Sequence, residues 1–228
     1  MTVLGLSQIM ASLPYLLKVG MTFSLTLTAL AAVFGLMLGT LLALCRMSPS
    51  KLVSVPATFY VNGMRSVPLL LVIFWFYFLA PYVGAWITHS SMPVEVGAYR
   101  SAVITFTLFE SAYFCEIMRA GIASISRGQI HAGLALGLSY QQTMITVVFP
   151  QAVRNMTPAL LTRVITLFQD TSLVYVLSMT DFFGAASEIA ARDGSTVEMY
   201  VFAAAVYFAI SFSASRLVKR FETARCAH

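Results

Sequence analysis

Five apolar stretches, each close to the length of a membrane-spanning helix, divide this sequence from one end to the other. These stretches cover approximately residues 20–44, 67–86, 96–118, 158–177 and 199–218, and polar segments separate them. A helix needs roughly 20 apolar residues to cross the hydrocarbon core of a bilayer. Because 59% of the residues are hydrophobic and only 10% are charged, a fold in water would expose large apolar patches. The sequence therefore predicts an all-α integral membrane protein with five transmembrane helices in a single domain, residues 1–228.

The 14 Lys and Arg residues are distributed unevenly around these stretches. With the N-terminus outside, only Lys18, Arg100 and Arg192 lie on the outer side, and all the others lie on or near the cytoplasmic side. Cytoplasmic segments of membrane proteins carry an excess of Lys and Arg, so the C-terminus is expected in the cytoplasm. The cations form no patch interleaved with aromatic residues, and no nucleic-acid partner is expected. The three cysteines are far apart in the sequence, so no metal site is expected either.

An odd number of spans without an internal repeat does not suit the two-half architecture of many secondary transporters. One chain is therefore expected to form half of a passage. In the first stretch, Gly35 and Gly39 have the small-xxx-small spacing that lets two helices approach closely. Two interpretations stay open, namely packing within the chain and a seam between two chains.

A cytoplasmic segment at about 127–155 combines small residues with a polar stretch at 139–143. Four small residues within six positions favour a short helix with one smooth face, and Gly137 favours a turn at 136–138. Such a face lets another protein approach the backbone, which predicts a docking site. The alternative is an ordinary amphipathic connector. The candidate docking residues are Gln129, His131, Ala132, Gly133, Gly137 and Ser139.

This segment resembles the EAA loop of ABC importer permeases for polar amino acids. The loop has Glu-Ala-Ala, three residues, Gly, and an apolar ending before Pro. Here the corresponding positions are His131, Ala132, Gly133, Gly137 and 147–150, with histidine in place of glutamate. The segments 59–77, 109–129, 149–162 and 168–183 are also similar to these permeases, and most similar to those of the glutamate/aspartate importers.

The resemblance implies a type I ABC importer (MetI-like) permease fold in a bacterial inner membrane, with a periplasmic N-terminus and a cytoplasmic coupling helix. It also implies two cytoplasmic ATPase subunits, which bind ATP and Mg, and a periplasmic amino-acid-binding protein. A second permease is implied as well, a related chain rather than a copy, because glutamate/aspartate systems use two. The chain itself is expected to hold no cofactor, and its expected substrate is glutamate or aspartate.

Ionisable side chains inside apolar runs are costly, so each needs a partner or a wet cavity. Arg163, Thr166 and Asp170 are spaced i, i+3 and i+7 and form one polar stripe about 10 Å long. An amino acid needs an acceptor for its ammonium group and donors for its carboxylates. The candidate pathway residues are Arg65, Glu110, Arg163, Thr166, Gln169, Asp170, Thr171 and Ser172.

Structural interpretations of these groups stay open beside the pathway role. The stripe could bond across helices and hold the bundle together, Arg65 could reach the headgroups, and Glu110 could pack as a protonated carboxyl. Glu116 and Arg119, spaced i, i+3, are expected to form a structural ion pair.

No motif of a hydrolase, metalloprotease or phosphate-binding loop occurs in the sequence, so the chain is expected not to be an enzyme. ATP would then be hydrolysed in partner subunits. The alternative function is an ion-coupled amino acid carrier or channel that works without an ATPase. Transport without ATP would distinguish it from the importer.

Overall fold

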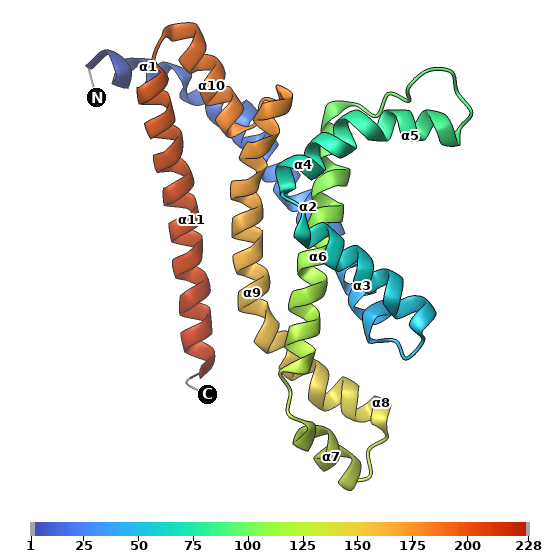
Figure 1. The fold of residues 1–228 in the computed structure, drawn as a ribbon. Coiled ribbons are helices and arrows are strands. Elements are labelled where there is room, and N and C mark those ends of the chain that lie inside the picture. Colours follow the sequence, from blue (N-terminus) through green and yellow to red (C-terminus); the bar gives the residue numbers. More distant parts are fainter. Residues whose placement is uncertain (1–2, 227–228) are drawn as a thin grey trace.

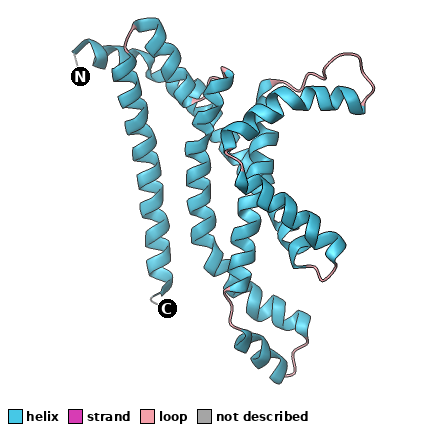
Figure 2. Cartoon of the chain, viewed as in Figure 1, coloured by secondary structure: helices cyan, strands magenta, loops and turns pink. Residues whose placement is uncertain are grey.

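The computed structural model describes residues 3–226, and every regular element within them is a helix (Figure 2). The α-helices in chain order are α1 (Val3–Tyr15), α2 (Thr22–Met47), α3 (Lys51–Ser66), α4 (Leu69–Phe74), α5 (Ala80–Ile87), α6 (Ala98–Ala123), α7 (Arg127–Ala135), α8 (Tyr140–Thr143), α9 (Phe149–Asp170), α10 (Phe182–Asp193) and α11 (Thr196–Cys226). Three π-helical segments, Leu16–Met21, Trp75–Leu79 and Met144–Val148, and one 3₁₀ segment, Thr171–Leu177, continue these helices.

The prediction of five membrane spans is confirmed by length and composition. Five continuous helical stretches are long and apolar enough to cross a membrane, namely Gln8–Met47, Leu69–Ile87, Ala98–Ala123, Tyr140–Leu177 and Thr196–Thr223. The first and fourth stretches have 40 and 38 residues, far more than the predicted runs. In both, helical structure begins well before the apolar run does, so hydropathy alone placed their starts too late.

Two of the π-helical segments have a local cause in proline. Pro81 and Pro150 each stand two residues after the end of such a segment. A proline has no N–H group, and its ring crowds the carbonyl four residues earlier, which belongs here to Tyr77 or Thr146. A wider turn at that carbonyl relieves the crowding without ending the helix. The chain changes direction at the second of these segments, between α8 and α9 (Figure 1).

The packing of α2 along α6 forms the most extensive helix interface of the chain. A Cβ atom added to Gly39 would lie 2.8 Å from Cβ of Phe114, and one added to Gly35 would lie 3.1 Å from Cβ of Glu110. Both glycines therefore let α2 approach α6 closely. Of the two interpretations of this small-residue spacing, packing within the chain is confirmed.

The helices α7 and α8, which form the predicted docking segment, lie at one end of an elongated helical molecule, opposite α1 (Figure 1). The hairpin of α7 and α8 lies at one end, and α11 runs along the molecule so that the C-terminus points toward that end. The N-terminus, α10 and α5 lie at the other end. Helices α6 and α9 run side by side between the two ends and pack against each other.

Helices α3 and α10 also lie outside the predicted spans. Helix α3 packs against α2 and α6, where Val61 is fully buried. Helix α10 begins at Asp181, whose carboxylate accepts the N–H groups of Phe183 and Gly184 at 3.0 and 2.9 Å. It ends at Gly194, whose φ of +67° is the left-handed conformation that glycine adopts easily.

Candidate functional site

The segment predicted to dock a partner folds as a helical hairpin. Helix α7 ends in a turn where Gly137 has φ +84° and the N–H of Leu138 donates to the carbonyl of Gly133 at 3.2 Å. The predicted turn at 136–138 is therefore confirmed. Ser139 begins α8 with a capping box, because its hydroxyl accepts the N–H of Gln142 at 3.2 Å and its own N–H donates to Oε1 of Gln142 at 2.9 Å.

The predicted docking residues divide by burial. The exposed ones are Gln129, His131, Ala132, Gly137 and Ser139. Gly133 is buried, and a Cβ atom added to it would lie 2.5 Å from Cγ2 of Thr143. The small size of Gly133 thus serves contact between α7 and α8 of the same chain. Helical structure continues from α8 to α9, which begins at Phe149, so the end of the predicted 127–155 loop is helical.

The hairpin is anchored where α6 ends and α9 begins. Nδ2 of Asn155 donates to the hydroxyl of Ser124 at 2.8 Å. A Cβ atom added to Gly121 would lie 2.8 Å from Cβ of Met156, so the two helices cross closely at this point. A force applied to the hairpin therefore reaches both α6 and α9.

Arg163 of α9 is bound by Glu110 of α6. Its Nε and Nη2 donate to the two carboxylate oxygens at 2.7 and 2.6 Å. The side chain of Glu110 is 0% exposed, and that of Arg163 is 15% exposed. Nη2 of Arg163 also lies 3.7 Å from Oδ2 of Asp170. Through Arg163, the polar stripe predicted on α9 thus bonds to another helix, α6, as the structural interpretation of the stripe predicted.

The other candidates on this part of the chain are less constrained. The hydroxyls of Thr166, Thr171 and Ser172 each donate to a carbonyl three or four residues earlier, at 3.3, 2.7 and 2.8 Å. Gln169 is exposed, and Asp170 is partly exposed, at 28% of its side chain. The contact of Asp170 with Arg163 is long, so its carboxylate can still accept a donor such as an ammonium group.

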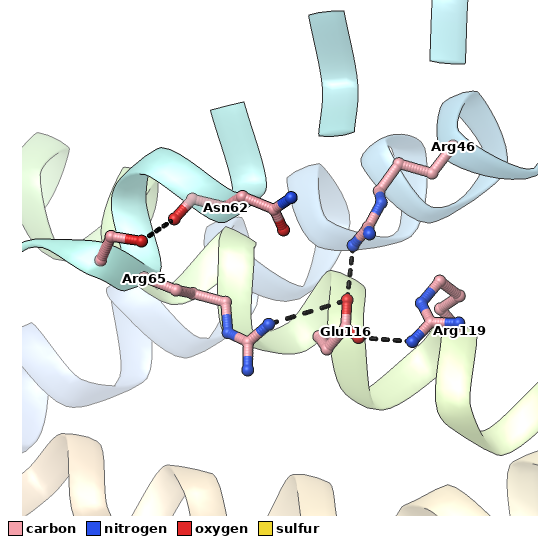
Figure 3. Close-up of polar contacts among 6 residues, drawn as sticks. Arg46, Asn62, Arg65, Glu116 and Arg119 are labelled. Atoms are coloured by element: carbon pink, nitrogen blue, oxygen red, sulfur yellow. Dashed lines mark hydrogen bonds and ion pairs between the residues drawn. The ribbon is translucent and has the colours of Figure 1, made fainter. Parts of the chain in front are cut away.

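A second charged cluster surrounds Glu116, nearer the hairpin end of α6 (Figure 3). Nη1 of Arg46 and Nη2 of Arg119 lie 2.5 Å from its carboxylate oxygens, and Nη1 of Arg65 lies 3.9 Å away. The expected pair of Glu116 and Arg119 is confirmed. The participation of Arg46 was not predicted, because in the sequence this residue served only as one of the cytoplasmic cations that indicate the orientation. Figure 3 shows the three arginines reaching this carboxylate from three different helices.

Together these groups form what we call the charged row, which follows α6 through the bundle. Its members are Arg46, Arg65, Glu110, Glu116, Arg119, Arg163 and Asp170. Apart from Arg192 with Asp193, every ion pair within 4 Å in residues 3–226 belongs to this row. The same residues contain no group of three or more His, Cys, Asp or Glu side chains placed to hold a metal ion.

Five apolar spans, a charged row inside the bundle and a helical hairpin at one end define a membrane-embedded transport subunit. A family model described as the binding-protein-dependent transport system inner membrane component matches residues 35–225. The chain belongs to this family of ABC importer permeases.

Individual relatives agree with this assignment. The chain is 50% identical over 212 residues to the glutamate/aspartate import permease protein GltK of Escherichia coli O6:H1, covering 93% of this chain and 94% of that protein. The crystal structure of an amino acid ABC transporter with histidines matches with a TM-score of 0.85 and 30% identity, over 98% of this chain and 99% of that one. An inward-facing structure of the MetNI methionine ABC transporter matches in fold, with a TM-score of 0.66 and 19% identity over 91% of this chain and 96% of that one. The expected type I importer (MetI-like) fold is confirmed.

Proposed function

We propose that this chain is the permease subunit of an ATP-driven importer that moves polar amino acids, above all glutamate and aspartate, across a bacterial inner membrane. The observation that carries the substrate proposal is the 50% identity to a glutamate/aspartate import permease over 93% of the chain.

The partners follow from the importer proposal. Two cytoplasmic ATPase subunits dock on the hairpin of α7 and α8 and bind ATP and Mg, so ATP hydrolysis takes place in them. A periplasmic amino-acid-binding protein delivers the substrate, and a second, related permease completes the passage. Five exposed docking residues in the hairpin and its anchorage to α6 and α9 support this role.

The proposed orientation has a periplasmic N-terminus and a cytoplasmic C-terminus. The distribution of Lys and Arg supports it. The relative position of the elements is consistent with it, because the hairpin and the C-terminus lie toward one end of the molecule and the N-terminus lies at the other (Figure 1).

For the substrate path, we propose different roles for the members of the charged row. Arg163 is bound by Glu110, which suits a role in holding α6 to α9. Asp170 is the acceptor for the substrate ammonium group, because its one ion pair is long. Arg65 is the donor for a substrate carboxylate, because its side chain is 37% exposed and its ion pair measures 3.9 Å. Thr166, Gln169 and Ser172 border the path near Asp170, whereas Thr171, also a candidate from the sequence, is buried.

Uptake by vesicles that contain the complete transporter tests the substrate. Accumulation of labelled glutamate should require ATP, and unlabelled glutamate and aspartate should compete with it. Competition by arginine without competition by glutamate would contradict the substrate proposal. Transport that persists without ATP would contradict the importer proposal and support an ion-coupled carrier.

A matched pair of substitutions tests the docking role of the hairpin. Leu136 in the hairpin and Leu52 on α3 are 83% and 89% exposed. Burying a leucine in an interface contributes about 1.5–3 kcal/mol, so Leu136→Ser should weaken association with the ATPase about tenfold or more. Leu52→Ser should leave association unchanged. Equal retention of the ATPase by both variants in a pull-down would contradict docking at this site.

A further inference from the structure

Four residues of α6 recur at intervals of three, namely Glu110, Tyr113, Glu116 and Arg119. Residues at this spacing follow a row that turns slowly around a helix, and each step rises about 4.5 Å. Three of the four belong to the charged row. Tyr113 is the fourth, and it lies between the two carboxylates.

The ring of Tyr113 is shared by two arginines from different helices. Cζ of Arg163 lies 3.9 Å from the ring centroid, and Cζ of Arg65 lies 5.5 Å from it. A guanidinium group within about 6 Å of an aromatic centroid is attracted by the negative charge of the ring face. The ring also packs against Phe109 at a centroid distance of 5.2 Å, which limits its movement. One side chain therefore holds a cation of each of the two charged clusters.

The two arginines differ in what else binds them. Arg163 donates two hydrogen bonds to the carboxylate of Glu110. Within residues 3–226, the one carboxylate within 4 Å of Arg65 is that of Glu116, which two other arginines approach more closely. Arg65 is therefore the least tightly paired guanidinium group of the charged row. The ring of Tyr113 adds an attraction that restrains Arg65 where its long ion pair with Glu116 restrains it only weakly.

Attraction to an aromatic ring restrains a guanidinium group without using its N–H groups as hydrogen-bond donors. Those N–H groups match a carboxylate with two parallel hydrogen bonds. A guanidinium group restrained in this way has less conformational entropy to lose when an anionic ligand binds.

We propose that Tyr113 is a positioning residue that holds Arg65 ready for a carboxylate of the substrate. This inference rests on the proposed import of acidic amino acids and adds a residue that acts through Arg65 rather than on the substrate. Its effect on substrate binding should pass through Arg65, because Arg163 is held by Glu110 as well, and this separates it from a general packing role.

The test measures binding of radiolabelled L-glutamate to the assembled permease and ATPase complex without the binding protein. Tyr113→Leu removes the ring and should weaken binding about tenfold. Tyr113→Phe keeps the ring and should change binding less than about twofold. Arg65→Gln should weaken binding at least as much as Tyr113→Leu, because it removes a charged hydrogen-bond donor. The double variant Tyr113→Leu with Arg65→Gln should bind no more weakly than Arg65→Gln alone.

The outcomes separate this inference from the proposed function. Additive losses in the double variant would show that Tyr113 acts independently of Arg65, and would overturn the inference while leaving the substrate proposal intact. Absence of glutamate binding in the unchanged complex would overturn this inference, and the uptake assay would then decide the substrate proposal separately. Should Tyr113→Leu fail to assemble, Arg65→Lys still tests the premise that a planar guanidinium at this position holds the substrate carboxylate, because lysine keeps the charge and loses the planar group. It should weaken binding about tenfold, and unchanged binding would overturn the inference.

Discussion

Replacing Arg163 by methionine should be among the most destabilising single changes in this chain. The substitution keeps most of the side-chain volume and leaves the carboxylate of Glu110, which is 0% exposed, without its two hydrogen bonds. Breaking a buried ion pair by removing one partner costs about 3–5 kcal/mol. A carboxyl group with an ordinary pKa near 4.3 can instead be protonated at pH 7 for about 3.7 kcal/mol, which limits the cost. We expect a loss of about 3 kcal/mol.

Replacing the other partner of the ion pair, Glu110, should lower the free energy of unfolding by less. Glu110→Gln leaves Arg163 with an amide in place of the carboxylate and with Asp170 at 3.7 Å, and Arg163 is partly exposed. The charge therefore keeps a partner. The double variant, Glu110→Gln with Arg163→Met, leaves no unpaired charge between α6 and α9. It should be more stable than Arg163→Met alone by about 1–3 kcal/mol.

Reversible unfolding in mixed micelles of increasing SDS content measures these free energies, with the unchanged protein as the reference. The decisive quantity is the interaction free energy of the double-mutant cycle. If the losses of the two single variants simply add in the double variant, the pair does not act as a unit. The reasoning from its geometry would then be refuted.

Two further predictions, one on packing and one on titration, use the same unfolding assay. Gly39→Ala should lower the free energy of unfolding by about 1–3 kcal/mol, because the added Cβ would meet Phe114. In the control Gly63→Ala, the added Cβ has nothing within 4 Å, so the substitution should be neutral or stabilise the protein by about 1 kcal/mol. Equal effects of the two substitutions would contradict the packing argument. Burial raises the pKa of Asp181 from 3.8 to about 6, so the folded state holds this proton more tightly. Relative to Asp181→Asn, the free energy of unfolding should therefore fall by about 3 kcal/mol as the pH rises from about 4 to about 6, and parallel pH profiles would contradict it.

The spans and the hairpin turn were predictable because their causes are local. A helix in hydrocarbon must be apolar along its length, and hydropathy detects that directly. Gly137 marks the end of α7 because glycine adopts positive φ without strain. The start and end of α10 also carry local signals, the cap residue Asp181 and Gly194. The polar composition of that segment marked it only as a break between apolar stretches.

The pairing within the charged row was not predictable, because it depends on how helices cross. Glu110 and Arg163 are 53 residues apart, and their contact requires the observed packing of α6 on α9. The role of Arg46 depends in the same way on the packing of α2 along α6. One feature of the α6 sequence did indicate that its two carboxylates share a face, because Glu110, Tyr113 and Glu116 follow one another at intervals of three residues.

The charges of the row favour an acidic substrate. With every group ionised, four arginines oppose three carboxylates, Glu110, Glu116 and Asp170, so the empty row carries one net positive charge. One unbalanced charge at membrane depth costs roughly 2.5–3.5 kcal/mol on insertion scales. Glutamate and aspartate carry one net negative charge at neutral pH and would cancel it. Arginine would double it, so on the proposed path the row would disfavour a cationic amino acid, and the loosely paired Arg65 is where that selection would act.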